Sequence, residues 1–145
     1  MFKSYGIIGH YGMVGSALLK WLNSQNRTIY GYDIKDGTKE DQNKVANSEI
    51  IFVCVPTPYR NGIDISAVKS SIEWINKFRK KNHYPIVIIK STVPPRTTEE
   101  LQKNFPKLLL MMNPEFLTEI TAYNDMSFPD RQILGVTKQS YRFAK

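Results

Sequence analysis

Short runs of apolar residues alternate along the chain with segments whose apolar residues recur at every third or fourth position. Three runs are nearly uninterrupted, as is typical of parallel strands buried on both faces: residues 4–8, 49–55 and 86–89. Weaker runs predict further strands over residues 28–33, 108–112 and 132–136. The pattern therefore predicts about six strands, separated by helical segments.

Two segments carry a long apolar stripe at helical spacing. The first begins at residue 13, and its apolar residues are Met13, Val14, Ala17, Leu18, Trp21 and Leu22. In the second, residues 65–78, the apolar positions are spaced 3, 4, 3 and 3, and Asp64 is placed to cap the helix. Both segments are predicted to be amphipathic helices that pack on the sheet.

Three further segments give weaker signals. A short helix is predicted from Glu99, with Thr97 or Thr98 as its cap, and another over residues 116–124. The polar segment 35–47 is expected to hold at most a short helix and to serve as a connector.

The alternation of strands and helices predicts an α/β fold. We expect a Rossmann-like, doubly wound and mostly parallel sheet of about six strands, with helices on both faces in three αβα layers. Residues 1–137 are predicted to form this domain, and residues 138–145 a C-terminal tail that is either ordered or frayed.

Length and cysteine content exclude several classes of protein. A chain of 145 residues suits one domain and is short for a two-domain enzyme of ordinary size. The one cysteine, Cys54, excludes a disulfide scaffold and a cysteine-cluster metal site, so no metal is expected. The apolar runs, such as residues 108–112, are far short of the ~20 residues of a membrane helix. With no signal-peptide pattern, a cytoplasmic protein without a membrane partner is expected.

The charge is modestly positive, with 20 Lys+Arg against 13 Asp+Glu and a formal net charge of +7. The densest basic cluster, residues 77–81, falls at the end of a predicted helix, where cations complement the helix dipole and face water. A nucleic-acid partner is therefore not expected. A positive field does favour an anionic ligand.

A glycine-rich turn joins the first predicted strand to the first helix. Its glycines, Gly9, Gly12 and Gly15, are spaced Gly-x-x-Gly-x-x-Gly, one residue longer after Gly9 than the usual dinucleotide-binding pattern. In such turns the glycines make the tight bend, admit a pyrophosphate close to the backbone and pack the helix on the strand. The helix N-terminus then favours phosphate. The residues predicted to contact a dinucleotide here are Gly9, Tyr11, Gly12, Met13, Val14 and Gly15.

Asp33 ends the second predicted strand, 18 residues after Gly15. An acidic residue about 20 residues beyond the turn bonds the adenosine ribose in dinucleotide-binding domains. A carboxylate there disfavours a 2′-phosphate, so NAD is predicted over NADP, although Lys35 close by leaves NADP open. The alternative is that Asp33 is only a turn or capping residue.

Several segments together resemble one known family, over residues 5–135. Besides the glycine turn, these are Val-Cys-Val-Pro-Thr-Pro at 53–58, Lys-Ser-Thr-Val-Pro-Pro at 90–95, Asn-Pro-Glu-Phe-Leu-Thr-Glu at 113–119 and Pro-Asp-Arg at 129–131. They resemble the N-terminal domain of nucleotide-sugar dehydrogenases, the UDP-glucose 6-dehydrogenase and GDP-mannose dehydrogenase group. That family uses NAD twice to oxidise a primary alcohol of a sugar nucleotide to a carboxylate.

The resemblance implies roles for residues outside the glycine turn. Pro56 and Thr57 would line the cofactor groove. Thr92 and Glu119 would lie near the nicotinamide, with Thr92 positioning a catalytic water, and Glu115 would be the acid–base carboxylate. The alternative is that Glu115 and Glu119, four apart, are two solvated positions on one helix face. Cys54, within an apolar strand, is expected to be a core residue rather than a nucleophile.

The chain also departs from the family. It has no counterpart of the catalytic cysteine, of the lysine and asparagine that accompany it, or of the sugar-nucleotide domain. The stretch between Asp33 and Glu49 is short, and Arg96 stands where a glycine generally follows the two prolines.

The hypothesis that follows is an NAD-binding domain that acts on a UDP- or GDP-sugar only with a separate or missing domain, and that is not active alone. The alternatives are a stand-alone dinucleotide-binding sensor or regulatory module, and another Rossmann dehydrogenase of the hydroxyacid or phosphogluconate kind. The oligomeric state stays open.

Overall fold

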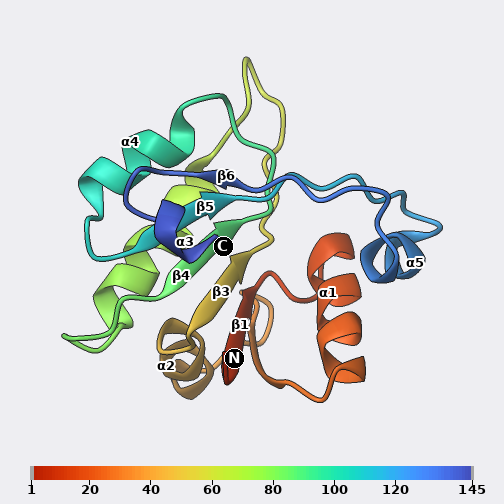
Figure 1. Cartoon of the computed structure of the whole chain (residues 1–145), viewed down its shortest axis with the longest axis horizontal. Coiled ribbons are helices and arrows are strands. Elements are labelled where there is room, and N and C mark those ends of the chain that lie inside the picture. Colours follow the sequence, from red (N-terminus) through yellow and green to blue (C-terminus); the bar gives the residue numbers. More distant parts are fainter. Residues whose placement is uncertain (1, 145) are drawn as a thin grey trace.

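The computed structural model describes residues 2–144 and contains one sheet in the order β2-β1-β3-β4-β5-β6 (Figure 1). Neighbouring strands from β2 to β5 are parallel, and β6 pairs antiparallel with β5. The strands are β1 (Ser4–Ile8), β2 (Thr28–Tyr32), β3 (Ile50–Val53), β4 (Ile86–Ile89), β5 (Leu109–Met112) and β6 (Gly135–Val136). The predicted Rossmann-like, mostly parallel sheet is confirmed.

Helices cover both faces of this sheet. They are α1 (Met13–Ser24), α2 (Lys39–Ala46), α3 (Ser66–Phe78), α4 (Thr97–Asn104) and α5 (Ala122–Ser127), followed by a 3-10 turn at Tyr141–Phe143. The buried apolar side chains of α1 and α5 form one cluster on one face, and those of α2, α3 and α4 form the main core on the other. No helix among residues 2–144 is long and apolar enough to cross a membrane.

The order of the strands sets the position of a ligand site. β1 lies between β2 and β3, so the chain leaves β1 in one direction and crosses back over it to reach β3. Open parallel sheets bind ligands at such a switch point, outside the carboxyl ends of the strands. The glycine-rich turn follows β1 at this point, and the segment after β3 lies beside it, with the Cys54 N–H donating to the Ile8 carbonyl at 2.9 Å.

The segment 35–47 contributes more than a connection. Its short helix α2 begins after Thr38, which forms a capping box with Asp41, and ends in Val45 and Ala46, both fully buried. The short helix agrees with the prediction, but its contribution to the core was not predicted because only these two positions are apolar. Two residues are too few to give a helical stripe, and their burial depends on α3 packing beside them.

The predicted helix over residues 116–124 was wrong in position. Residues 113–118 have no regular secondary structure, and α5 begins only at Ala122. Asp125 accepts hydrogen bonds from the Thr118 N–H at 3.1 Å and the Thr121 hydroxyl at 2.7 Å, which fixes the chain in a turn before the helix. The backbone bond from Thr118, followed by the Thr121 hydroxyl, lowers the pKa of Asp125. Glu115 and Glu119 therefore do not share a helix face.

Helix α4 begins differently from the predicted threonine cap. Arg96 is its N-cap and has a φ of 72°, in the left-handed region, and the buried Thr97 is already the first helical residue. A side chain in this conformation is strained because its Cβ crowds the following carbonyl. The glycine that the family generally has at this position would carry no such strain.

Replacing Arg96 with glycine is therefore expected to raise the free energy of unfolding by about 0.5 to 1 kcal/mol, the released strain outweighing the flexibility that glycine adds to the unfolded chain. Urea unfolding measures the difference. Arg60→Gly is the matched control because Arg60 is also exposed but has no positive φ. This substitution should not raise the free energy of unfolding. An Arg96→Gly chain less stable than the parent would contradict the prediction.

After β5 the chain forms an extended arm. It runs out to α5, which packs beside α1, and then returns to β6 at the sheet edge (Figure 1). The C-terminal residues then pack beneath β5: Ser140 is fully buried and donates to the Leu110 carbonyl at 2.7 Å. Gln102 and Thr137 join the same buried polar group, with the Thr137 hydroxyl 3.0 Å from Gln102 Oε1.

Candidate functional site

The three glycines of the turn after β1 have different surroundings. Gly9 has a φ of +81°, and a Cβ there would lie 2.5 Å from the Cys54 carbonyl oxygen. A Cβ on Gly15 would lie 2.2 Å from the Gly9 carbonyl oxygen. These two glycines allow the turn, the third strand and the start of α1 to approach one another closely.

Gly12 differs because little surrounds it. A Cβ there would have its nearest neighbour, the Gly9 carbonyl oxygen, at an ordinary 3.4 Å. Gly12 is the N-cap of α1, and no side chain caps the helix or adds an acidic group to its first turn. The unpaired N–H groups and the positive end of the helix dipole are therefore available to an anion.

A cavity of about 420 Å³ opens beside this turn. It extends from the glycine turn across the ends of β2 and β3 to α3, where the rings of Tyr32 and Trp74 stack with centroids 5.3 Å apart. The residues that line it are mainly apolar, and they include Gly9, Tyr11, Gly12, Asp33, Cys54 and Pro56. A mostly apolar cavity with a few polar groups at its edge is typical of a cofactor site.

Asp33 lies at the edge of this cavity and is 9% exposed. Its Oδ1 accepts from the Lys35 N–H at 3.2 Å, and its Oδ2 accepts from the Tyr11 N–H at 3.4 Å, a long bond. These two bonds orient the carboxylate and leave each oxygen a further acceptor position. The arrangement can accept two neighbouring hydroxyl groups.

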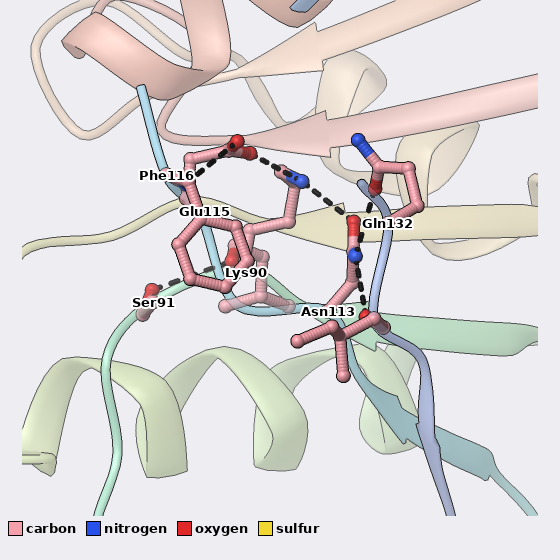
Figure 2. A network of polar contacts seen from close by, with 8 residues as sticks. Lys90, Ser91, Asn113, Glu115, Phe116 and Gln132 are labelled. Atoms are coloured by element: carbon pink, nitrogen blue, oxygen red, sulfur yellow. Dashed lines mark hydrogen bonds and ion pairs between the residues drawn. The ribbon is translucent and has the colours of Figure 1, made fainter. Parts of the chain in front are cut away.

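A second polar cluster lies where β4 and β5 end (Figure 2). Lys90, only 4% exposed, follows β4 and places its Nζ 2.5 Å from Glu115 Oε2 and 2.7 Å from Asn113 Oδ1. The Glu115 side chain is 12% exposed, so this ion pair is almost wholly withdrawn from water. A buried lysine requires such partners because desolvation of an unpaired ammonium is very costly.

Asn113 ties this cluster to the returning arm. Its Nδ2 donates to the Ile133 carbonyl at 2.7 Å and to Gln132 Oε1 at 3.0 Å (Figure 2). Lys90 is thereby held between the ends of two strands and the segment that leads to β6. The ion pair consequently sets the position of the Glu115 carboxylate relative to the sheet.

The other two residues expected to be catalytic lie outside both features. Thr92 is exposed in the loop after β4, and Glu119 is exposed in the turn before α5. Glu115, in contrast, lines a cavity of about 550 Å³ formed by the extended arm and α5. Of the residues expected at the cofactor, Met13 and Val14 lie in the first turn of α1 and Thr57 after β3, next to the first cavity but not in its lining.

A comparison with known families bears on this arrangement. The profile of the UDP-glucose/GDP-mannose dehydrogenase family, NAD binding domain, matches residues 34–144. The chain belongs to this family. The match begins just after Asp33, so the glycine turn lies outside it and is supported by its own geometry.

Curated relatives agree with this family. The putative UDP-glucose 6-dehydrogenase YtcA of Bacillus subtilis is 33% identical over an alignment of 113 residues that covers 72% of this chain and 26% of the relative. UDP-glucose 6-dehydrogenase 1 of Arabidopsis thaliana is 31% identical over an alignment of 137 residues that covers 78% of this chain and 28% of the relative. The chain thus spans about a quarter of the length of these relatives.

Solved structures show the same fold. A GDP-mannose dehydrogenase from Pseudomonas aeruginosa superposes with a TM-score of 0.81 at 23% identity, over 97% of this chain and 42% of that one. A UDP-glucose dehydrogenase from Pyrobaculum islandicum gives a TM-score of 0.85 at 22% identity, over 99% of this chain and 43% of that one.

The residues around the first cavity fit NAD, the cofactor of this dehydrogenase family domain. Gly12 leaves open space at the N-terminus of α1, where a pyrophosphate finds N–H donors. The apolar wall formed with Tyr32 and Trp74 suits an adenine ring, and Asp33 suits ribose hydroxyls. The structure thus offers a suitable group for each part of the adenosine diphosphate moiety.

Cys54 lines the same cavity, but its thiol is not an activated nucleophile. Burial raises the pKa of its thiol to about 12; Lys90 opposes this shift and Glu115 adds to it. The thiol therefore stays protonated near neutral pH. The Lys90 N–H donates to the Val53 carbonyl at 2.9 Å, directly before Cys54 of the cavity lining, so Lys90 follows the strand next to the one that ends at this cavity.

The Cys54 thiol of the folded chain is consequently expected to react with Ellman's reagent at least about 100-fold more slowly at pH 8 than in urea-unfolded chain, since only the thiolate attacks. With one cysteine in the sequence the readout is unambiguous. Rapid modification of the folded chain would contradict both the burial and the raised pKa.

Sequence reasoning assigned no role to Lys90, Asn113 or Trp74. A lysine directly after the apolar run of β4 was an available signal, because a charged residue next to a buried strand needs a partner. Trp74 had no such signal, since its position lies outside the apolar stripe predicted for this helix. Its place beside Tyr32 follows only from the packing of α3 against β2.

Proposed function

We propose that this chain supplies the NAD-binding and acid–base part of a nucleotide-sugar dehydrogenase, which oxidises a primary alcohol of a UDP- or GDP-sugar to the carboxylate. The observation that carries the proposal is the buried Lys90–Glu115 pair, whose lysine is hydrogen-bonded to Val53, next to Cys54 in the lining of the first cavity. A domain that only binds a dinucleotide has no use for a carboxylate held in this way. Buried ion pairs that serve no site are often neutral or costly for stability.

The proposed roles follow the chain's own groups. NAD, when bound, accepts hydride from the carbon that is oxidised. The glycine turn and the N-terminus of α1 hold its pyrophosphate, Asp33 its adenosine ribose, and Pro56 and Thr57 line the groove. Glu115, held beside Lys90, takes a proton from a water that Thr92 positions, and Glu119 lies on the nicotinamide side.

The thiol chemistry of this reaction comes from elsewhere. Cys54 is the one cysteine of the 145 residues, and its burial and raised pKa remove it as a nucleophile. We infer that a separate polypeptide, or further residues of a longer protein, contribute the thiol and most of the contacts to the sugar nucleotide. The isolated chain is then expected to bind NAD without oxidising UDP-glucose or GDP-mannose.

A chimera tests the proposal directly. This chain would replace the corresponding N-terminal domain of the Bacillus subtilis relative, and NADH formation would be followed with UDP-glucose and GDP-mannose. The chimera is expected to turn over, and Glu115→Gln within it to lower kcat by about 10²- to 10⁴-fold with KM for NAD little changed. Glu99→Gln, an exposed carboxylate on α4, is the matched control and should leave kcat unchanged.

Two outcomes would overturn the proposal. NADH formation by the isolated chain would show that no outside thiol is needed. Full activity of the Glu115→Gln chimera would remove the acid–base role. A folded chimera that binds NAD but never turns over would instead favour the alternative of a non-catalytic dinucleotide-binding module.

A further inference from the structure

The glycine turn of this chain contains one more residue than the usual pattern, and its Tyr11 reaches the turn that follows β2. The Tyr11 hydroxyl donates to Asp36 Oδ2 at 2.6 Å, and the Tyr11 N–H donates to Asp33 Oδ2 at 3.4 Å. The Tyr11 ring also packs against His10, with ring centroids 4.1 Å apart. One residue of the phosphate-binding turn thus contacts two carboxylates at the adenosine end of the cavity.

The turn that carries Asp36 has a defined shape. The Gly37 N–H donates to the Asp33 carbonyl at 2.9 Å, which closes the chain over residues 33–37. A Cβ on Gly37 would lie 2.2 Å from the Tyr32 ring, so this turn packs tightly against the aromatic wall of the cavity. Asp36 is therefore presented to Tyr11 by a turn with little freedom, although its carboxylate is exposed to solvent.

The charge of Asp36 also acts on Tyr11. The hydrogen bond to Asp36, followed by its negative charge, raises the pKa of the Tyr11 phenol above its ordinary value of 10.0, and Asp33 adds to the shift. The phenol thus stays a hydrogen-bond donor throughout the neutral range, and its bond holds the Asp36 carboxylate next to Tyr11, which lines the cavity.

We propose that Asp36, held by Tyr11, is a second specificity residue that acts with Asp33 to select NAD over NADP. The 2′-phosphate of NADP brings between one and two negative charges to the ribose that Asp33 binds. With one carboxylate, an adjacent cation such as Lys35 can offset the repulsion. With two carboxylates, the single positive charge of Lys35 does not balance both negative charges, and their repulsion of the 2′-phosphate disfavours NADP.

This inference rests on the NAD site and is independent of the thiol and acid–base chemistry proposed above. Isothermal titration calorimetry of the full chain with NAD and NADP tests it. Asp36→Asn is expected to narrow the preference for NAD by about 10-fold through tighter NADP binding, with NAD affinity changed by less than about 3-fold. Tyr11→Phe, which frees the carboxylate without removing it, should narrow it by about 3-fold.

Controls separate this effect from general charge. Glu100→Gln removes one exposed carboxylate on α4 and should leave the ratio of the two affinities unchanged. Raising the salt concentration should narrow the NAD preference of the parent chain more than that of Asp36→Asn, because exposed charges are screened over about 10 Å at 0.1 M. An NMR titration of Tyr11 without ligand should show its pKa falling toward the ordinary value in Asp36→Asn.

An unchanged NAD-to-NADP ratio in Asp36→Asn would overturn the proposal, and so would a parent chain that binds neither nucleotide. Failure of the chimera to oxidise a sugar nucleotide would leave these affinities unaffected, so the two proposals can fail separately.

Discussion

Replacing Lys90 with methionine is expected to lower the free energy of unfolding by about 3 to 5 kcal/mol, because it removes one partner of a buried ion pair. The methionine side chain fills a similar volume but leaves the Glu115 carboxylate, 12% exposed, without its cation. It also removes the donor that Asn113 Oδ1 accepts from at 2.7 Å. For a domain of ordinary stability such a loss is a large part of the total, and urea unfolding at neutral pH measures it.

A double-mutant cycle identifies the ion pair as the cause. Lys90→Met combined with Glu115→Gln removes both charges, so the double variant should be more stable than the sum of the two single losses predicts, by about 1 to 3 kcal/mol. Lys44→Met is the control. Lys44 pairs with Glu40 at 2.7 Å on the solvent-exposed face of α2, where such a pair contributes less than about 0.5 kcal/mol.

If Lys90→Met lowers the free energy of unfolding by no more than Lys44→Met does, the buried pair contributes nothing to stability. If Lys90→Met does not fold, Lys90→Arg keeps the charge in a larger group and should retain most of the coupling to Glu115.

Replacing Gly15 with alanine is expected to lower the free energy of unfolding by about 3 kcal/mol, whereas the same change at Gly12 should cost less than about 1 kcal/mol. At Gly15 the new methyl group would lie 2.2 Å from the Gly9 carbonyl oxygen and 2.9 Å from the His10 Cα, both backbone atoms that cannot move aside separately. At Gly12 its nearest neighbour would lie at 3.4 Å.

Although Gly12→Ala should cost little stability, it should weaken the binding of NAD. Gly12→Ala keeps the fold but places a methyl group where the backbone must admit the pyrophosphate, so NAD affinity should fall by at least about 10-fold. Calorimetry of binding and urea unfolding, measured on both variants, check the pair of predictions. Unchanged NAD affinity in a stable Gly12→Ala chain would remove the glycine turn from the cofactor site.

The strands and the two long helices could be predicted from the sequence because their signals are local. An apolar run such as Ile50–Val53 or a stripe such as that of Ser66–Phe78 has little alternative to burial on a sheet. The helix ends were less predictable. The left-handed backbone conformation of Arg96 and the hydrogen bonds of Asp125 decide where α4 and α5 begin. Neither can be predicted from the spacing of hydrophobic residues.

The residues proposed for the cofactor site could be named from the sequence for the same reason. The glycines and Asp33 belong to one strand–turn–helix–strand unit, so their spacing along the chain determines their spacing in the fold. The extra residue after Gly9 was visible, but its consequence was not. That Tyr11 reaches Asp36, 25 positions further on, depends on how β1 and β2 pair.

By itself, then, the sequence determined the strands, the two long helices and the dinucleotide turn, because the signal for each lies within a short stretch of chain. Only the tertiary structure decided that Lys90 and Glu115 form a buried pair, and that Asn113 fastens the arm to it. These residues follow different strands and meet only because β4 and β5 are neighbours. Their burial is what makes the contact energetically important, since a charge removed from water is stable only beside its partner.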